Sequence, residues 1–217
     1  MSAPLVDVVA VSDALEAFPK EKSVDPDEVR KATSSTKRCL VVIDDDPTGS
    51  QAVSGIPVIT KWQVEDFHWA LNQGQSAIFV LLNTRAENEE TAKKLNDDAV
   101  SNAIAAAKKL GIDISFVSRG DSTLRGHFPA ETDAIAKALT DAGEKPNLAT
   151  LLIPAFPGAG RVTINGIHYL KTGDSLTPVG QTEFAKDATF GYLNSNLADF
   201  VEEKTHGSIL ASEVQKL

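Results

Sequence analysis

Short apolar runs that alternate with helical segments constrain the fold of this chain more than any other feature. Runs rich in β-branched residues lie at 39–43, 56–62, 77–82, 112–117 and 148–153. Residues 88–110 place alanine and leucine at three- and four-residue steps, which predicts a long amphipathic helix, and a shorter helix is predicted over 129–142. Strands that alternate with helices predict an α/β fold with a mostly parallel sheet and flanking helices.

The ends of these strands show where function is expected. We expect a Rossmann-like arrangement in three layers, in which right-handed crossovers place the loops after the strands along one edge of the sheet. Ligands of open α/β sheets bind outside the carboxyl ends of the strands. The most polar loops of the chain follow predicted strands in this way, at residues 44–50, 83–85 and 119–127.

Segments of different amino-acid composition lie on either side of this predicted core. Residues 1–37 are polar and mixed, which predicts an N-terminal arm and not a domain. After Phe156, Gly- and Pro-rich sequence and the tight-turn pair Asn165-Gly166 predict a small β-rich extension. A short helix over 196–204 and a strand over 208–217 would complete it. The predicted boundaries are therefore an arm at 1–37 and one domain at 38–217.

Composition excludes several classes of partner. The formal net charge is -9, so binding to a nucleic-acid backbone is not expected, and an anionic substrate would need a local arginine cluster. No apolar stretch approaches the roughly 20 residues of a membrane span. A single cysteine, Cys39, cannot form an internal disulfide, so a cytoplasmic location is expected.

Three adjacent carboxylates, Asp44, Asp45 and Asp46, follow the first predicted strand. Carboxylates in such a loop can accept protons, hold a divalent cation or bind sugar hydroxyls. An acidic turn in which Asp46 or Thr48 caps the next helix accounts for them equally well.

A second polar loop contains the string Asp121-Ser122-Thr123-Leu124-Arg125-Gly126. An arginine can hold a carboxylate or phosphate through two parallel hydrogen bonds, the hydroxyls can donate to anion oxygens, and Asp121 could serve as a general base. The competing interpretation is a capped surface loop in which Arg125 pairs with a local carboxylate.

Two further arginines are candidates on weaker grounds. Arg85 ends the polar string Asn83-Thr84-Arg85, where a structural salt bridge is an equal explanation. Arg161 follows a Gly-rich segment that lacks the context and the Gly-Lys-Ser/Thr ending of a phosphate-binding P-loop. The sequence therefore offers no recognised nucleotide cradle, and the histidine spacing predicts no metal site.

The strings 44–51, 83–85, 118–131 and 154–161 together resemble the four-carbon acid sugar kinase family in order and spacing. The Asp-Asp-Asp-Pro-Thr-Gly form resembles its YgbK-domain, or Hrp-dependent type III effector-like, branch. The resemblance implies an N-terminal domain that binds the sugar acid and a C-terminal domain that binds ATP. Members phosphorylate threonate, erythronate or 3-oxo forms at the terminal hydroxyl.

The chain resembles only the sugar-binding N-terminal domain of that family. We therefore expect kinase activity only with a nucleotide-binding partner domain or protein, which would supply ATP and Mg, and no cofactor for this chain alone. A stand-alone sugar-acid-binding or regulatory protein without kinase activity is the alternative, and a truncated reading frame is a third. Self-association is also expected, since a missing domain would leave an apolar face uncovered.

The resemblance also assigns roles to residues. Arg125, helped by Arg85 or Arg119, would hold the substrate carboxylate, while Asp45 and Asp121 would contact hydroxyls and one of them would accept the proton of the attacking hydroxyl. Further substrate contacts are expected from Asp44, Thr84, Ser122, Thr123, Gly126 and Arg161.

Overall fold

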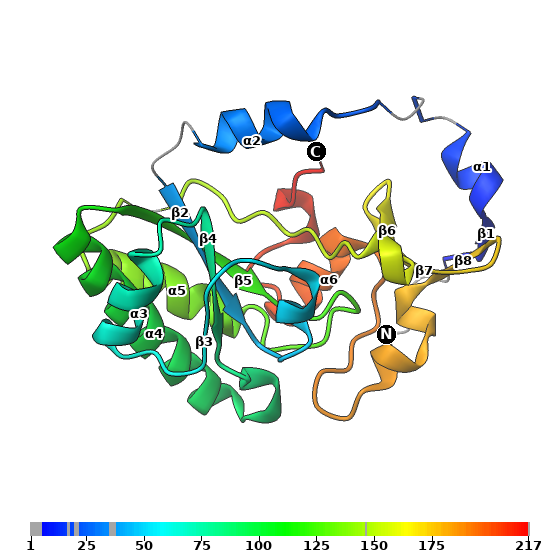
Figure 1. The fold of residues 1–217 in the computed structure, drawn as a ribbon. Coiled ribbons are helices and arrows are strands. Elements are labelled where there is room, and N and C mark those ends of the chain that lie inside the picture. Colours follow the sequence, from blue (N-terminus) through cyan, green and yellow to red (C-terminus); the bar gives the residue numbers. More distant parts are fainter. Residues whose placement is uncertain (1–5, 17, 20–21, 35–37, 146, 217) are drawn as a thin grey trace. The chain divides into compact units, whose positions relative to one another are not determined.

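The computed structural model describes residues 6–16, 18–19, 22–34, 38–145 and 147–216 (Figure 1). The chain divides into two compact units. The first, here called the parallel-sheet unit, comprises Glu21–Gly120 and Ala130–Thr150. The second, the antiparallel-sheet unit, comprises Met1–Lys20, Asp121–Pro129 and Leu151–Leu217. The boundaries predicted at residues 37 and 38 stay predictions.

The parallel-sheet unit is built on four parallel strands in the order β3-β4-β2-β5. The strands are β2 (Arg38–Asp44), β3 (Val58–Ile59), β4 (Ala77–Leu81) and β5 (Asp113–Arg119). In the register of the two central pairs, Asp44 lies opposite Leu81 on one side and Arg119 on the other. Three strands therefore end at the same level of the sheet.

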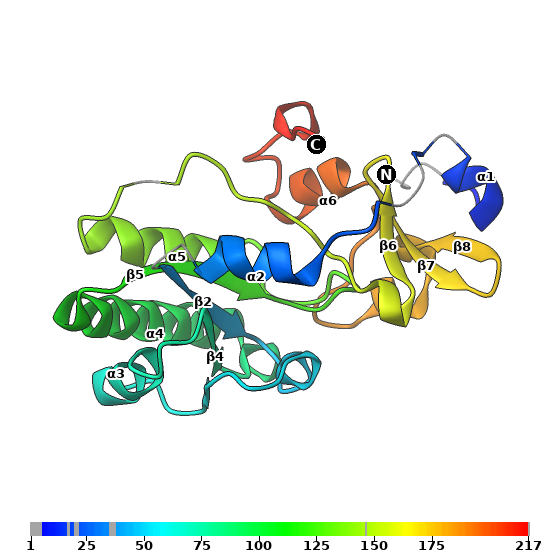
Figure 2. The same cartoon turned by 45° about the horizontal axis from the view of Figure 1, so that its top comes forward.

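Three helices cover one face of this sheet. They are α3 (Val64–Leu71), α4 (Glu89–Leu110) and α5 (Ala130–Asp141), and α4 packs against both of the others (Figures 1 and 2). The long helix begins where Asn88 Oδ1 accepts a hydrogen bond from Thr91 N at 2.9 Å, and it ends at Gly111, whose φ is 65°. Asn88 is thus the N-cap of this helix, and Gly111 ends it in the left-handed conformation.

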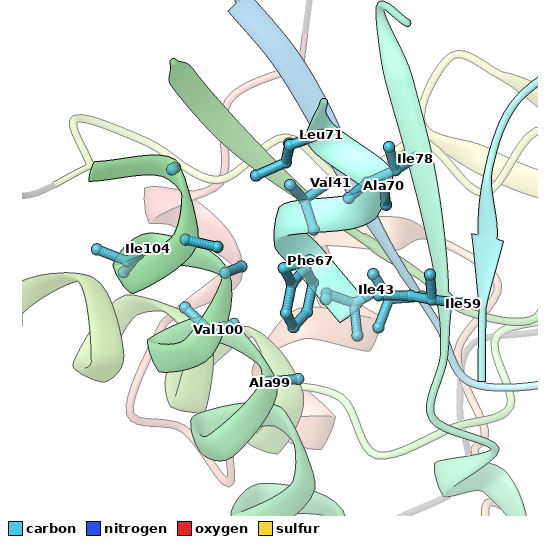
Figure 3. Packing of buried hydrophobic residues seen from close by; sticks show 14 of the residues in the cluster. Val41, Ile43, Ile59, Phe67, Ala70, Leu71, Ile78, Ala99, Val100 and Ile104 are labelled. Carbon is cyan, nitrogen blue, oxygen red and sulfur yellow. The ribbon is translucent and has the colours of Figure 1, made fainter. Parts of the chain in front are cut away.

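The hydrophobic core lies between these helices and the strands (Figure 3). Phe67 of α3 and Val100 of α4 are fully buried, and they face Val41 and Ile43 of β2. Because side chains alternate along a strand, Leu40 points to the opposite face, where it is 41% exposed. The second face of β2 is therefore partly exposed.

The antiparallel-sheet unit contains a second sheet in the order β1-β8-β7-β6. Its strands are β1 (Val9–Ala10), β6 (Arg161–Ile164), β7 (Ile167–Thr172) and β8 (Ser175–Pro178). The hairpin between β6 and β7 turns at Asn165 and Gly166, which both have positive φ as a tight type I′ turn requires. The predicted α/β class with a β-rich extension is confirmed.

Three further α-helices are described. α1 (Val11–Leu15) and α6 (Leu197–Lys204) belong to the antiparallel-sheet unit, and α2 (Pro26–Ser34) belongs to the parallel-sheet unit. The core of the antiparallel-sheet unit includes Leu124, Val179, Tyr192 and Phe200, the last of which belongs to α6. Because β1 pairs with β8, part of the predicted N-terminal arm takes part in a sheet. None of the helices in the described ranges is long and apolar enough to cross a membrane.

Two predicted strands are wrong. Residues 148–153 are irregular, with Leu148 fully exposed, and the described part of 208–217 contains only a 3₁₀ turn at Ala211–Glu213. The predicted run 56–62 shortens to Val58–Ile59. An apolar run becomes a strand only where its N–H and C=O groups pair with another strand, and such pairing is not visible in composition.

Candidate functional site

Charged side chains of opposite sign meet at the carboxyl end of the parallel sheet. Arg85 donates two hydrogen bonds to Asp45, from Nε to Oδ2 at 2.9 Å and from Nη2 to Oδ1 at 2.7 Å. Arg119 lies 3.2 Å from Asp44 Oδ1 and 3.7 Å from Asp45 Oδ1. The structure thus brings together four predicted site residues from three separate strand ends. We call Asp44, Asp45, Arg85 and Arg119 the Asp45 cluster.

Backbone pairing places these groups. Asp45 N donates to Arg119 O at 3.2 Å, and Arg85 N donates to Asp45 O at 3.1 Å, so the three chain segments are tied together just beyond the sheet. Asn83 takes a left-handed conformation with φ of 56°, which turns the chain after β4 into the short helix η2 (Thr84–Ala86). This turn directs Arg85 back to the end of β2.

Burial dominates the electrostatics of Asp45. Its side chain is 3% exposed, and this burial raises the pKa to about 6 although the hydrogen bonds from Arg85 oppose the shift. The nearby Glu131 carboxylate adds a smaller upward contribution. A carboxyl group with this pKa can accept and return a proton near neutral pH.

The carboxyl groups of Asp44 and Asp46 differ from that of Asp45, and from each other, in their hydrogen-bond partners and pKa shifts. Burial raises the pKa of Asp44, whose Oδ2 atom is buried without a hydrogen-bond partner, and a Cβ atom at Gly49 would overlap this carboxylate. Asp46 is held by hydrogen bonds from Thr48, which outweigh the effect of burial and lower its pKa. Asp46 therefore stabilises the turn after β2, and its Oδ2 atom also lies 3.4 Å from Arg85 Nη1. The alternative that Asp46 or Thr48 caps the next helix is not seen, because Thr48 is the N-cap residue of the short helix η1 (Gly49–Ala52) and makes no side-chain cap hydrogen bond.

A buried polar group that the sequence did not single out supports this site. Glu131 at the start of α5 is 6% exposed and accepts a hydrogen bond from Thr84 Oγ1 at 2.5 Å and one from Asn96 Nδ2 at 3.3 Å. Thr84 is fully buried, and its hydroxyl ties the loop that carries Arg85 to α5. Its contact with substrate stays a prediction. The only signal in the sequence was the position of Glu131 at the end of the resembling string 118–131.

The remaining predicted residues lie in the antiparallel-sheet unit, and three of them form a local network. Arg125 Nε donates to Asp121 Oδ2 at 2.6 Å, and Thr123 Oγ1 donates to the same oxygen. Burial favours a higher pKa for Asp121, but these hydrogen bonds outweigh it and lower the pKa. Arg125 also lies 3.8 Å from Asp187 Oδ2. The local ion pair named as the competing interpretation is therefore present.

Ser122, Gly126 and Arg161 have separate environments in this unit. Ser122 O accepts a hydrogen bond from His168 Nε2 at 2.7 Å, which fixes the proton on Nε2 and lets Nδ1 accept from Thr163 Oγ1 at 2.9 Å. Gly126 has a φ of 142°, a conformation that other residues rarely adopt. Arg161 packs on the Phe184 ring.

A hollow of about 490 Å³ lies elsewhere in the antiparallel-sheet unit. Its lining consists of Asn194, Asp199, Glu202, Glu203, His206 and Gly207. The two glutamates accept hydrogen bonds from backbone N–H groups, Glu202 from Ala211 and Glu203 from Leu193, so they stabilise local turns. None of the predicted site residues lines this hollow. Across the described ranges, no three His, Cys, Asp or Glu side chains gather as a metal site requires.

Comparisons with known proteins show which protein family this chain matches. Residues 40–217 match the model of the sugar-binding N-terminal domain. The D-erythronate kinase of Heliobacterium modesticaldum is 28% identical over 176 residues, which cover 78% of this chain and 37% of that protein. The chain therefore spans little more than a third of the length of this curated relative.

Two crystal structures of a domain of unknown function (DUF1537) from Bordetella bronchiseptica, with bound citrate and as a domain-swapped dimer, share the fold. The first has a TM-score of 0.56 at 24% identity and covers 76% of this chain and 40% of its own. The second has a TM-score of 0.53 at 25% identity, with 75% and 39% covered.

The family match and the similarity to a D-erythronate kinase confirm the resemblance that the sequence motifs predicted, and the two crystal structures show the same fold. Since the family model accounts for residues 40–217, the chain belongs to the sugar-binding N-terminal domain family.

Proposed function

We propose that this chain is the substrate domain of an ATP-dependent kinase and that it binds a four-carbon acid sugar such as erythronate or threonate. The observation that carries the proposal is the Asp45 cluster at the carboxyl end of the parallel sheet, where open α/β folds bind their ligands. The similarity to a D-erythronate kinase supports the class of substrate. The citrate in the structural neighbour supports a small carboxylated ligand.

The cluster has the donors and acceptors that a carboxylated polyol needs. Carboxylate oxygens of Asp44 and Asp45 accept from hydroxyls, and guanidinium groups donate to a carboxylate. Arg119 is the more available arginine, because its side chain is 28% exposed and its contacts with the acids are 3.2 and 3.7 Å long. Arg85 is 17% exposed and is bound at both ends of its guanidinium fork.

Of the two predicted proton acceptors, Asp45 and Asp121, we propose that Asp45 is the general base. A general base is most effective when its pKa lies near the working pH. Burial raises the pKa of Asp45 to about 6, whereas hydrogen bonds from Thr123 and Arg125 hold the pKa of Asp121 below its usual value. Asp45 would accept the proton of the attacking terminal hydroxyl while Arg85 holds its carboxylate in place.

ATP and Mg²⁺ belong, in this proposal, to a nucleotide-binding partner domain. The residues described above neither gather three carboxylates nor form a phosphate-binding loop, so no step through the metal or the nucleotide is assigned to them. A cytoplasmic setting and self-association are part of the proposal. The single buried cysteine, Cys39, supports the first, and the domain-swapped dimer of the structural neighbour supports the second.

Calorimetry with erythronate, threonate and uncharged erythritol tests the substrate class. An Arg119→Gln variant should bind both acids about tenfold or more weakly, since the charge-assisted contact with the substrate carboxylate is lost. Arg30→Gln, at an exposed pair with Asp27, is the matched control. Equal heats from wild type and Arg119→Gln with either acid would remove the Asp45 cluster from substrate binding.

A further inference from the structure

Two buried side chains hold the backbone of the loop that contains Asp121. His168 on β7 donates a hydrogen bond from Nε2 to Ser122 O at 2.7 Å. Tyr192 donates one from its hydroxyl to Thr123 O at 2.6 Å. The two accepting carbonyl groups are successive along the chain. Because His168 is fully buried and Tyr192 is 3% exposed, neither hydrogen bond competes with solvent.

Each donor is itself fixed by its neighbours. His168 lies opposite Thr163 in the register of β6 and β7, and its Nδ1 atom accepts a hydrogen bond from Thr163 Oγ1 at 2.9 Å. Burial lowers the pKa of His168 although two backbone carbonyl groups oppose the shift, so the neutral ring with its proton on Nε2 is favoured. The Tyr192 ring packs edge-on against Phe200 with 5.5 Å between the centroids. Burial raises the pKa of Tyr192, so its hydroxyl keeps the proton that it donates.

The segment that they hold is a tight turn over residues 121–124. Leu124 N donates to Asp121 O at 2.9 Å, and Leu124 has a φ of 65° while its side chain lies in the same core as Tyr192. Because a left-handed conformation is unfavourable for leucine, the turn depends on contacts that keep it in place. Its carbonyl groups face the buried donors. Its side chains form a separate network, in which Asp121 accepts hydrogen bonds from Thr123 and Arg125.

We propose that His168 and Tyr192 are positioning residues, which keep the turn 121–124 in the conformation in which Asp121 pairs with Arg125. Both act through the backbone, and neither is proposed to touch the substrate. Neither lies in a string that carries the family resemblance. The turn belongs to the second polar loop, so its conformation sets how that loop meets a sugar acid. This last part rests on the proposed function, whereas the coupling of the two donors to Asp121 does not.

Carbon-13 NMR of the Asp121 carboxyl group, in the whole chain without ligand, tests the coupling. Tyr192→Phe removes only a hydroxyl that is uncharged throughout the titration. It should move the Asp121 midpoint upward by about 0.5 to 1 pH unit, as the loosening of one hydrogen bond gives. Leu176→Ala, at a buried position of β8, should lower stability in urea and leave the midpoint unchanged. A midpoint that Tyr192→Phe does not move, or that Leu176→Ala moves as far, would overturn the positioning role of Tyr192.

A pair of variants separates the hydrogen bond of His168 from its charge. His168→Gln keeps an N–H donor near the place of Nε2, whereas His168→Leu has none, and neither variant can be charged. The Asp121 midpoint should therefore rise further in His168→Leu than in His168→Gln. Equal midpoints in these two variants would show that His168 does not act as a donor to the turn.

Calorimetry with erythronate tests whether the positioning serves the substrate. Tyr192→Phe should bind erythronate about three- to tenfold more weakly than wild type, as the misplacement of one polar contact predicts. Leu176→Ala should bind it like wild type. A moved Asp121 midpoint with unchanged affinity would overturn the part of the inference that concerns substrate. If wild type binds no erythronate, the proposed function fails, and the midpoints still decide whether the two donors position Asp121.

Discussion

Each of the two units contains a network of ion pairs between aspartate and arginine. The pKa of the aspartate is raised in one network and lowered in the other. In the Asp45 cluster, a carboxylate and an arginine that are 40 residues apart meet beside a buried strand end, and burial raises the pKa of the acid. In the antiparallel-sheet unit, Asp121 and Arg125 are four residues apart, and local hydrogen bonds lower the pKa of the acid. An aspartate next to an arginine can therefore have either a raised or a lowered pKa. The balance of desolvation against hydrogen bonding decides its protonation.

The largest expected difference between the networks is in catalysis. Asp45→Asn should lower phosphoryl transfer by about 10²- to 10⁴-fold, the usual contribution of a general base. Asp121→Asn should change it much less, because a carboxylate with a lowered pKa is a weak proton acceptor. The measurement is the release of ADP from ATP when erythronate is supplied to the chain together with the proposed nucleotide-binding partner domain. A larger loss in Asp121→Asn than in Asp45→Asn would reverse the assignment of the base.

The second expected difference is in the pH dependence of stability. The pKa of Asp45 in the folded protein, about 6, exceeds the roughly 3.9 of an unfolded aspartate. Its contribution to the free energy of unfolding is thus fully present below about pH 4 and is lost as pH rises through 6. Asp121 has the opposite sign: its lowered pKa adds stability above about pH 4, and this is lost as pH falls through the folded pKa.

Urea unfolding at pH 4.5 and pH 7 measures both signs. Relative to Asp45→Asn, wild type should gain roughly 2 kcal/mol on going from pH 7 to pH 4.5, as linkage with these two pKa values gives. Relative to Asp121→Asn, wild type should lose stability over the same step or stay level. A difference between wild type and Asp45→Asn that does not vary with pH would show that the Asp45 carboxyl titrates normally.

Much of the Asp45 cluster could be predicted from sequence because it lies at strand ends. Apolar runs located β2, β4 and β5, and the parallel arrangement then placed Asp44, Arg85 and Arg119 at one edge. The protonation of Asp45 could not be predicted, because it depends on burial, which a motif does not report. The irregular segment 148–153 was missed for a similar reason, since its apolar composition is that of a strand and only a pairing partner would make it one.

Thr84 and Glu131 were the least predictable part of the site. They are 47 residues apart, and both side chains are of types that usually face solvent, yet they form a buried hydrogen bond. A threonine after a strand and a glutamate at a helix start each have an ordinary local explanation, a turn and a favourable helix end. Only the packing of α5 against α4, which carries Asn96, makes them one network.

The smallest expected effect separates the charge of Glu131 from its hydrogen bonds. Glu131→Gln keeps an oxygen for Thr84 and Asn96 but removes a negative charge near Asp45, so the Asp45 titration midpoint should move to lower pH. Carbon-13 NMR of the aspartate carboxyl groups measures this, with Glu90→Gln at the exposed start of α4 as the control.

Glu131→Ala removes both charge and acceptor, so it should also displace the loop that carries Arg85 and weaken erythronate binding further. If the two variants shift the midpoint and the affinity equally, Glu131 acts through its charge alone, and the buried bond to Thr84 does not position Arg85. If neither moves the midpoint, desolvation by itself sets the pKa of Asp45, and the contrast with Asp121 rests on burial without any contribution from a neighbouring acid.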